Sequence, residues 1–277
     1  MVQLSSFRLI FHYKKGMIIS RMRRRLGVYM KKTICLVLSL FFIPCILSAN
    51  AYDSTKHGWG QGYNVNDRNQ PIDCVKFNDK YAKYNATFLK SSENEIVLTF
   101  DEGYENGYTN NILDILKQNN VKAIFFITYD YAKSNNDIVK RMISEGHVIG
   151  NHTTNHPSTA CISKEKLESE INFLHNYVKE NFAFEMNLFR PPMGEFSQQS
   201  LCYTNELGYK SVFWSFAYKD YDINNQPQPD DALKRTIDAL HPGAIYLLHA
   251  VSETNSQILD EFIKTTKQKG YKFTTDV

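Results

Sequence analysis

From Glu95 onward the chain alternates between short apolar runs rich in β-favouring residues and amphipathic stretches with helical spacing. The predicted strands cover residues 96–100, 123–127, 147–150, a segment ending near 189, 211–214, 244–248 and 271–274. The predicted helices cover residues 110–118, 137–144, 164–180, 198–207, 231–240 and 256–269. Repeated strand–helix units imply parallel strands. About seven such strands favour an α/β fold built as a distorted (β/α) barrel over an open sheet.

The segment before this pattern, residues 52–94, is polar and aromatic with weak periodicity. We expect an irregular N-terminal arm with one helix near residues 77–84. The arm includes the run His57-Gly58-Trp59-Gly60. With 277 residues and 43% hydrophobic content, the chain can bury one full core. Residues 95–277 are therefore predicted to form a single domain, which the arm extends at its N-terminal side.

Residues 1–51 have the features of a leader segment. Lys31 and Lys32 precede an apolar run at residues 34–47, and Ala49-Asn50-Ala51 follows it as a small-x-small cleavage pattern. The run is short for a bilayer span. We expect a signal peptide at about residues 30–51, cleavage after Ala51 and an extracytoplasmic location; an uncleaved membrane anchor is the alternative. Residues 1–29 are read either as a mis-assigned gene start, with translation from residue 30, or as a long basic n-region.

Charge and cysteine usage limit the partners of the mature protein. The leader holds nine of the 32 Lys and Arg residues and no acidic residue, so residues 52–277 carry 23 basic and 29 acidic residues, a net charge of −6. Nucleic acid is therefore not an expected partner. Cys74, Cys161 and Cys202 remain after the leader, an odd number that predicts buried free thiols. We expect a monomer without a protein partner.

Polar clusters follow the predicted strands, where (β/α) barrels carry their active sites. Asp101 and Glu102 end the first strand and can supply a general base and a metal ligand. A solvated turn is the alternative reading of this pair. His152 and His156 follow another strand at a spacing that lets two imidazoles on a helical turn share a divalent metal, typically zinc. Either pair alone is weak evidence; together they favour a metal-dependent hydrolase.

Two further clusters supply the remaining groups. Arg190 lies in Phe189-Arg190-Pro191-Pro192-Met193-Gly194, where the prolines stiffen the loop and a fixed guanidinium can orient a carboxylate. His249 ends the strand at 244–248 and can act as a general acid. A surface arginine and a core histidine are the alternatives. A metal, a carboxylate base and a histidine acid are sufficient for amide hydrolysis.

In this order, the clusters resemble the motifs of the NodB-homology polysaccharide deacetylases (carbohydrate esterase family 4) over residues 95–277. The resemblance implies a distorted (β/α) barrel and a divalent metal, usually zinc. It implies that Asp101 is the catalytic base and that Arg190 positions it. It further implies that His249 is the general acid. The same resemblance implies that His152 and His156 are metal ligands and that Leu247 lines the acetyl pocket.

Three departures from the family pattern stand out. Glu102 replaces the second aspartate, a metal ligand, so its ligation is left open. Ala217 replaces the aspartate that tunes the acid histidine, and Tyr221 replaces a tryptophan. Because Ala217 cannot tune the histidine, we expect either a lowered pKa for His249 or another acidic partner for it. Candidate substrate-binding residues beside Leu247 are Tyr221, Asp220, Tyr104 and Pro192.

The run Thr99-Phe100-Asp101-Glu102-Gly103-Tyr104-Glu105-Asn106-Gly107-Tyr108-Thr109 is similar to the first motif of the delta-lactam-biosynthetic de-N-acetylases. That branch resemblance implies a substrate of N-acetylmuramic acid in peptide-stripped peptidoglycan, and muramic delta-lactam of the spore cortex as the outcome. The alternatives are a deacetylase of N-acetylglucosamine in peptidoglycan or chitin-like glycans, and a non-catalytic glycan-binding protein on a deacetylase scaffold.

Overall fold

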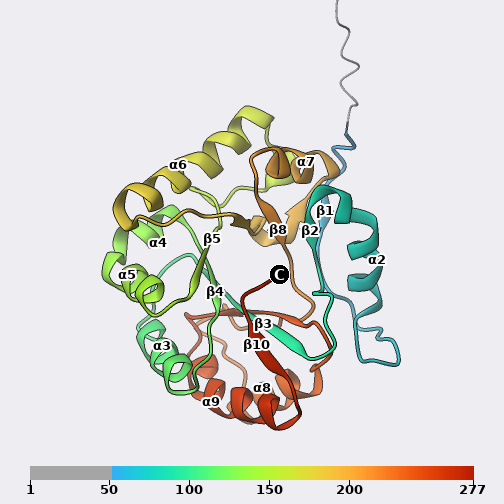
Figure 1. Ribbon diagram of the computed structural model, residues 1–277, viewed down its shortest axis with the longest axis vertical. Coiled ribbons are helices and arrows are strands. Elements are labelled where there is room, and N and C mark those ends of the chain that lie inside the picture. Colours follow the sequence, from blue (N-terminus) through green and yellow to red (C-terminus); the bar gives the residue numbers. More distant parts are fainter. Residues whose placement is uncertain (1–51) are drawn as a thin grey trace, which may run out of the picture. The chain divides into compact units, whose positions relative to one another are not determined.

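The computed structural model describes residues Tyr52–Val277, so the predicted signal peptide and upstream segment lie outside it. One sheet forms the centre of this part of the chain, and Figure 1 shows its strands arranged in a ring with helices outside. Its strands are β2 (Ala86–Thr87), β3 (Glu95–Glu102), β4 (Ile124–Ile127), β5 (Val148–Asn151), β6 (Leu188–Phe189), β8 (Lys210–Val212), β9 (Ile245–His249) and β10 (Lys272–Thr274).

All strand pairs of this sheet are parallel. The order runs β10-β3-β4-β5-β6-β8-β2, and β9 pairs with β3. A bridge between Phe216 and Tyr246 connects the chain beyond β8 to β9 and closes the ring. The predicted distorted barrel is confirmed. The strand that sequence periodicity missed is β2, which is only two residues long and comes from the arm.

The helices that cover the outside of the sheet are α3 (Thr109–Gln118), α4 (Tyr129–Ser134), α5 (Asn136–Ser144), α6 (Lys164–Phe182), α7 (Gln198–Glu206), α8 (Pro229–Asp238) and α9 (Glu253–Gln268). Six of them match the predicted helices within a few residues. The six-residue α4 was not predicted, because it is too short to show a helical period. Ser163 caps α6 by accepting a hydrogen bond from the Lys166 N–H, as its position predicted.

The arm is more ordered than expected. It contains α2 (Ile72–Tyr81), the 3₁₀ turn η1 (Ala82–Tyr84) and β1 (His57–Gly58), which pairs antiparallel with β7 (Glu195–Phe196). Trp59 is buried in an aromatic cluster in which its ring meets Phe77 and Phe88. The helix predicted near residues 77–84 is present as α2 and η1, although it begins earlier, and most of the remaining arm is irregular, as predicted.

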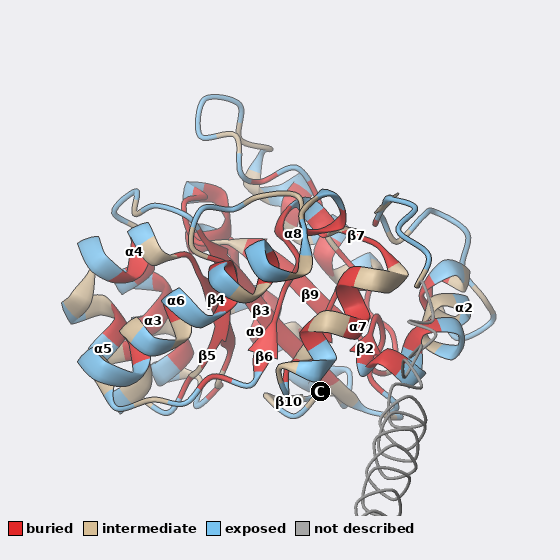
Figure 2. Ribbon diagram, turned by 90° about the horizontal axis from the view of Figure 1, so that it is seen from above, coloured by how far each residue is buried: buried red, intermediate tan, exposed pale blue. Residues whose placement is uncertain are grey.

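Alternation along β3 decides which residues face the inside of the barrel. Ile96, Leu98 and Phe100 are in the core between sheet and helices. Val97 belongs to a second buried cluster made of the opposite strand faces, together with Ile124, Phe126, Leu188, Val212 and Ile245. Figure 2 shows burial concentrated on the strands and exposure on the outer helix surfaces. Since side chains alternate along a strand, odd-numbered residues of β3 face inward and even-numbered ones face the helices.

Two further expectations concern the described residues. Cys74, Cys161 and Cys202 are free thiols, but Cys161 is exposed, so the expectation of three buried thiols was wrong for that residue. It ends η2 (Thr159–Cys161), a short turn whose other two residues are buried and which sequence periodicity did not reveal. Within residues 52–277, no helix combines the length and apolar character needed to cross a bilayer.

Candidate active site

Asp101 stands at the inner face of β3, near its carboxyl end, with 8% of its surface exposed. Its Oδ1 accepts a hydrogen bond of 2.8 Å from Arg190 Nη1. Its Oδ2 lies 3.6 Å from His152 Nε2, toward the cavity. Burial alone would raise the pKa of Asp101, but the charges of Arg190 and of the neighbouring histidines outweigh burial and lower it. The carboxylate is therefore ionised and has one oxygen free for chemistry.

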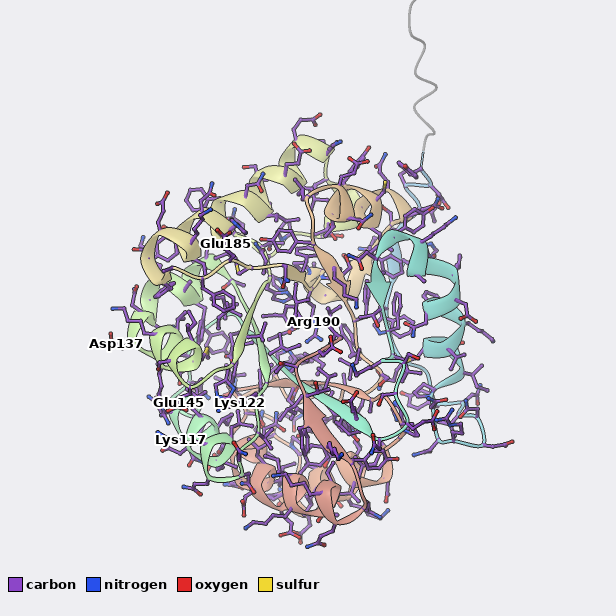
Figure 3. The ribbon with its side chains drawn as sticks, in the orientation of Figure 1. Lys117, Lys122, Asp137, Glu145, Glu185 and Arg190 are labelled. Carbon is purple, nitrogen blue, oxygen red and sulfur yellow. The ribbon has the colours of Figure 1, made fainter. Side chains whose placement is uncertain are left out.

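Arg190 is fully buried, and Figure 3 shows it near the middle of the ring of strands. Its Nε donates to the Val212 carbonyl at 3.0 Å and its Nη2 to the Phe213 carbonyl at 3.1 Å. Nη1 donates to Thr99 Oγ1 at 2.7 Å as well as to Asp101. Contacts on every side of the guanidinium fix its plane, so it can hold Asp101 in one orientation, as the sequence predicted.

The two histidines of the second cluster converge on the same space. His152 Nε2 and His156 Nε2 are 3.2 Å apart. His152 Nδ1 lies 2.8 Å from the Arg190 carbonyl, so Nδ1 carries the proton and Nε2 presents a lone pair. Burial lowers the pKa of His152 to about 4 and also lowers that of His156, which keeps both imidazoles neutral. This donor set fits two ligands of a divalent metal.

The histidine segment is a loop and not the helical turn that the spacing suggested. Thr153 and His156 have φ of 71° and 55°, the left-handed region that side chains with a β-carbon rarely adopt. Asn151 Oδ1 accepts from the Thr153 N–H at 2.9 Å, and Thr153 Oγ1 accepts from the His156 N–H at 2.9 Å. These bonds stabilise the strained backbone, which in turn brings the two rings together.

Glu170, on α6, supports this loop from behind. It is 1% exposed, and its carboxylate accepts from both the N–H and the side-chain amide of Asn155, each at 2.8 Å. Its own carbonyl accepts from Thr154 Oγ1 at 2.8 Å. Lys166 lies 2.7 Å from the same carboxylate. A buried carboxylate with this many donors anchors the segment between the two histidines.

His249 has a partner that sequence reasoning missed. Its Nδ1 lies 2.7 Å from Asp220 Oδ1, and its backbone N–H donates to Asp220 Oδ2 at 2.8 Å. Burial by itself would lower the pKa of His249, but the charge of Asp220 and its hydrogen bond outweigh burial, and the pKa is raised. The expected lowering was wrong. The alternative, another partner in place of Ala217, is what the structure has.

The structure therefore places Asp220 outside the cavity lining, away from the substrate contact that the sequence predicted. Its side chain is fully buried, and the hydrogen bonds of its carboxylate are with His249 and the first turn of α9. The sequence signal was present, since Asp220 lies only three residues after the expected position. A loop connects the two positions, so residue counting alone did not show which carboxylate reaches the histidine.

A cavity of about 540 Å³ opens over these groups. Its polar wall is formed by Asp101, His152, His156 and His249. Its less polar wall includes Trp214, Ala217, Tyr218, Tyr221 and Leu247. Leu247 and Tyr221 are thus where the sequence placed them. Pro192 is buried in η3 (Pro192–Gly194) and Tyr104 lies outside the cavity lining, so the structure does not support substrate contact for either.

Residues that sequence reasoning missed complete the cavity. Gly194 has φ of 66°, and a β-carbon there would come within 2.7 Å of the Trp214 ring. Trp59 of the arm donates through Nε1 to the Trp214 carbonyl at 2.9 Å. Its backbone N–H also donates to the Gly194 carbonyl at 3.0 Å. The His57-Gly58-Trp59-Gly60 run therefore supports the cavity wall, a role that only long-range packing reveals.

Glu102 does not join the histidines. It is an even-numbered residue of β3 and faces the helices, fully buried, with no hydrogen-bond partner for either carboxylate oxygen. Burial and the nearby charges of Glu105 and Asp101 raise its pKa well above the usual value. Among residues 52–277, no group of three or more His, Cys, Asp or Glu side chains is arranged as a metal site. Strand alternation therefore places the Glu102 side chain on the helix side of β3, away from the two histidines.

We expect Glu102→Gln to raise the free energy of unfolding at pH 8 by more than about 1 kcal/mol. In the folded wild type the raised pKa keeps the acid protonated to a higher pH than in the unfolded chain, which releases that proton above its ordinary pKa. Its contribution to stability is therefore complete below the unfolded pKa and is lost as the pH rises toward the folded pKa. Thermal unfolding at pH 5 and pH 8 measures this, and the variant should gain mainly at pH 8.

The exposed Glu180→Gln, on α6, is the matched control and should change neither value. Bound divalent metal, measured by elemental analysis after dialysis, should be the same in Glu102→Gln and in the wild type. A variant that loses metal would show that Glu102 is a ligand after all.

The fold and the site together define a class of enzyme, and the comparisons agree. The sequence profile of polysaccharide deacetylases matches residues 89–212. The chain is 42% identical over 228 residues to the peptidoglycan-N-acetylmuramic acid deacetylase PdaA of Bacillus subtilis, covering 81% of this chain and 86% of the relative. This chain belongs to the polysaccharide deacetylases of carbohydrate esterase family 4, hydrolases that remove acetyl groups from glycans.

Two further comparisons place it within the family. The structure of Bacillus subtilis PdaA, described as a family 4 carbohydrate esterase, superposes with a TM-score of 0.75 at 40% identity, covering 79% of this chain and 94% of that one. A peptidoglycan-N-acetylglucosamine deacetylase of Bacillus cereus is 34% identical over 202 residues, covering 71% of each chain. The predicted family and enzyme class are confirmed.

Proposed function

We propose that this protein removes the acetyl group from N-acetylmuramic acid in peptidoglycan, leaving an amine that closes to muramic delta-lactam. The observation that carries the proposal is the 42% identity over most of both chains to a protein named for N-acetylmuramic acid, against 34% to one named for N-acetylglucosamine. The first-motif run at residues 99–109 supports the same branch. The spore cortex is the proposed setting.

The site residues suit this reaction in complementary ways. Asp101 Oδ2 faces the cavity and accepts a proton from the attacking water, while Arg190 keeps the carboxylate oriented. His249, protonated through its pairing with Asp220, presents Nε2 to the departing amine and donates a proton there. Leu247 gives the acetyl methyl group an apolar wall. Activity therefore requires ionised Asp101 and protonated His249, and the two pKa shifts widen that pH range at both ends.

We propose a divalent metal, zinc by ligand preference, held by His152 and His156. Their converging Nε2 atoms and neutral state support this assignment. When bound, the metal supplies polarisation of the acetamide carbonyl and of water. With Glu102 facing the helices, the two histidines are the protein groups that hold it. His152→Ala is expected to lower the bound metal content.

Glu170→Gln is expected to weaken zinc binding by about 10-fold or more, because one of the two bonds that anchor Asn155 between the histidines is lost. Isothermal titration of metal-free protein with zinc gives the Kd. Glu168→Gln, two residues away on the same helix and partly exposed, is the control and should leave Kd unchanged. An unaltered Kd for Glu170→Gln would show that Glu170 does not position the two histidines for zinc.

The substrate is tested by mass spectrometry of muropeptides after the protein and a divalent metal act on peptide-stripped peptidoglycan. Loss of acetyl from muramic acid, with or without loss of water, supports the proposal. Loss of acetyl only from glucosamine residues, or faster release from chito-oligosaccharides, would favour the alternative substrate. Efficient deacetylation of peptidoglycan with intact stem peptides would contradict the muramic acid branch.

We further propose that the protein acts outside the cytoplasm, because residues 30–51 read as a signal peptide and peptidoglycan lies there. N-terminal sequencing of the protein from cell fractions tests this. A new N-terminus at Tyr52 in an extracytoplasmic fraction is expected. An intact leader in the membrane fraction would favour the anchored alternative.

A further inference from the structure

Asp220 is a buried carboxylate held by three donors. Besides the Nδ1 and backbone N–H of His249, it accepts a hydrogen bond of 2.6 Å at Oδ2 from Asn255 Nδ2. Asn255 lies in the first turn of α9 and is 1% exposed. The side chain that determines the state of His249 is thus itself oriented by a residue that belongs to none of the family motifs noted in the sequence.

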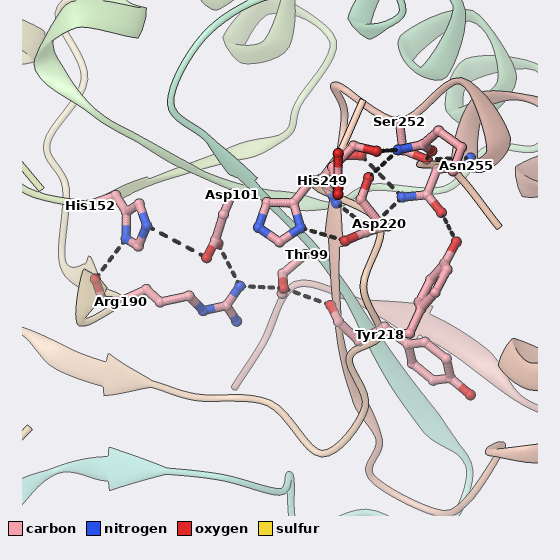
Figure 4. A network of polar contacts seen from close by, with 12 residues as sticks. Thr99, Asp101, His152, Arg190, Tyr218, Asp220, His249, Ser252 and Asn255 are labelled. Carbon is pink, nitrogen blue, oxygen red and sulfur yellow. Dashed lines mark hydrogen bonds and ion pairs between the residues drawn. The ribbon is translucent and has the colours of Figure 1, made fainter. Parts of the chain in front are cut away.

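The orientation of Asn255 is fixed at both ends of its amide, as Figure 4 shows. Nδ2 also donates to the His249 carbonyl at 3.1 Å, and Oδ1 accepts from the Tyr218 hydroxyl. Its backbone N–H donates to Oγ of Ser252, the N-cap of α9, at 3.0 Å. With Oδ1 occupied by a donor, Nδ2 must face Asp220, so the amide has one favourable orientation.

The same helix end holds the loop that carries Asp220. Ser252 Oγ donates to Gln226 Oε1 at 2.5 Å. Gln226 Nε2 in turn donates to the carbonyls of Asp220 and Asp222 at 2.7 and 2.8 Å. Both the side chain and the backbone of Asp220 are therefore fixed from the start of α9.

We propose that Asn255 is a positioning residue for the general acid: it holds Asp220 in the rotamer in which one oxygen meets His249 Nδ1 and the other meets its N–H. This inference rests on the proposed role of His249. Without Asn255, the Asp220 carboxylate has one donor fewer and can rotate away from Nδ1. His249 then loses the contact that keeps it protonated and oriented toward the cavity.

The other charged groups around His249 are separate from Asn255. Asp101 on β3, Arg190 after β6 and His156 after β5 face it across the cavity, and the Tyr221 ring lies 5.6 Å from its ring. Asn255 has no hydrogen bond to any of these residues. A change in the titration of His249 in an Asn255 variant is therefore transmitted through Asp220.

Two variants that remove the amide donor of Asn255 test the proposal. Asn255→Ala is expected to lower kcat by about 10-fold to 100-fold with little change in KM, because a hydrogen bond to a charged group is lost. The alkaline limb of its pH–rate profile should move to lower pH. Asn255→Asp keeps the size of the side chain but replaces the donating amide with a carboxyl group that repels Asp220, so it should displace that carboxylate and move the limb to lower pH as well. A merely structural role would lower stability in both variants and move the limb in neither.

Ser256→Ala is the matched control: its hydroxyl donates to the Glu253 carbonyl at 2.7 Å in the same helical turn and does not touch Asp220. It should keep wild-type kcat and pH profile. NMR titration of His249 in wild type and Asn255→Ala needs no substrate, so it tests the inference even if muramic acid is not the substrate. A lower pKa in Asn255→Ala is expected; an unchanged pKa together with unchanged kcat overturns the inference.

Discussion

Replacing Asp101 by asparagine is expected to reduce kcat by about 100-fold to 10,000-fold, because an amide cannot take the proton of the attacking water. The change keeps the shape of the side chain. It also leaves the fully buried guanidinium of Arg190 without its counter-charge, which is expected to cost about 3–5 kcal/mol of stability. Acetate release and thermal unfolding of the same preparation measure the two effects.

The loss of activity must be measured on folded protein. The assay is therefore run at a temperature at which circular dichroism shows that the variant is native. Asp114→Asn is the matched control, since that carboxylate also pairs with an arginine, Arg141, but lies at the surface. It should retain full activity. A folded Asp101→Asn protein with activity within about tenfold of wild type would exclude Asp101 as the base.

Arg190→Lys is expected to destabilise the protein by about 3–5 kcal/mol and to abolish most activity, although it conserves the charge. The guanidinium reaches the Val212 and Phe213 carbonyls and Asp101 at the same time. A lysine ammonium is a single point on a flexible chain and cannot meet all three. Urea unfolding gives the stability, and acetate release gives the activity.

The control for this change is Arg141→Lys, in which the arginine also contacts several partners but lies at the surface. Its cost should remain below about 1 kcal/mol because solvent replaces the lost bonds. Arg190 supports both the barrel interior and the base. An Arg190→Lys protein that kept wild-type stability would therefore show that the buried bonds contribute little to the fold.

The fold was predictable because its signal is local. Seven β-favouring runs alternate with helical periods, and parallel strands in repeated units have few ways to pack. The positions of Asp101, Arg190 and His249 were also predictable, because each follows directly from a strand end. Short elements such as β2 and α4 were not, since they span too few residues to show a period.

The misreadings at the site have particular physical causes. Asp101 and Glu102 were treated as one pair, although neighbours in a strand must face opposite sides, a rule that was available from the sequence. Asp220 was assigned to the substrate because motif spacing does not show which carboxylate of a loop turns inward. Asn255 had no sequence signal, since nothing local marks a helix residue that contacts a loop 35 positions earlier.

The sequence by itself determined the barrel, the family and the inward-facing residues at the ends of its strands, because hydrophobic period and residue type act over short distances. The tertiary structure decided the partners that the sequence did not indicate: Asp220 for His249, Asn255 for Asp220, and Glu170 for the histidine loop. These contacts join segments 15 to 35 residues apart. The distances between these partners depend on how the helices and loops pack around the barrel. Because the groups are buried, their distances to neighbouring charges and hydrogen-bond partners determine whether each group is charged.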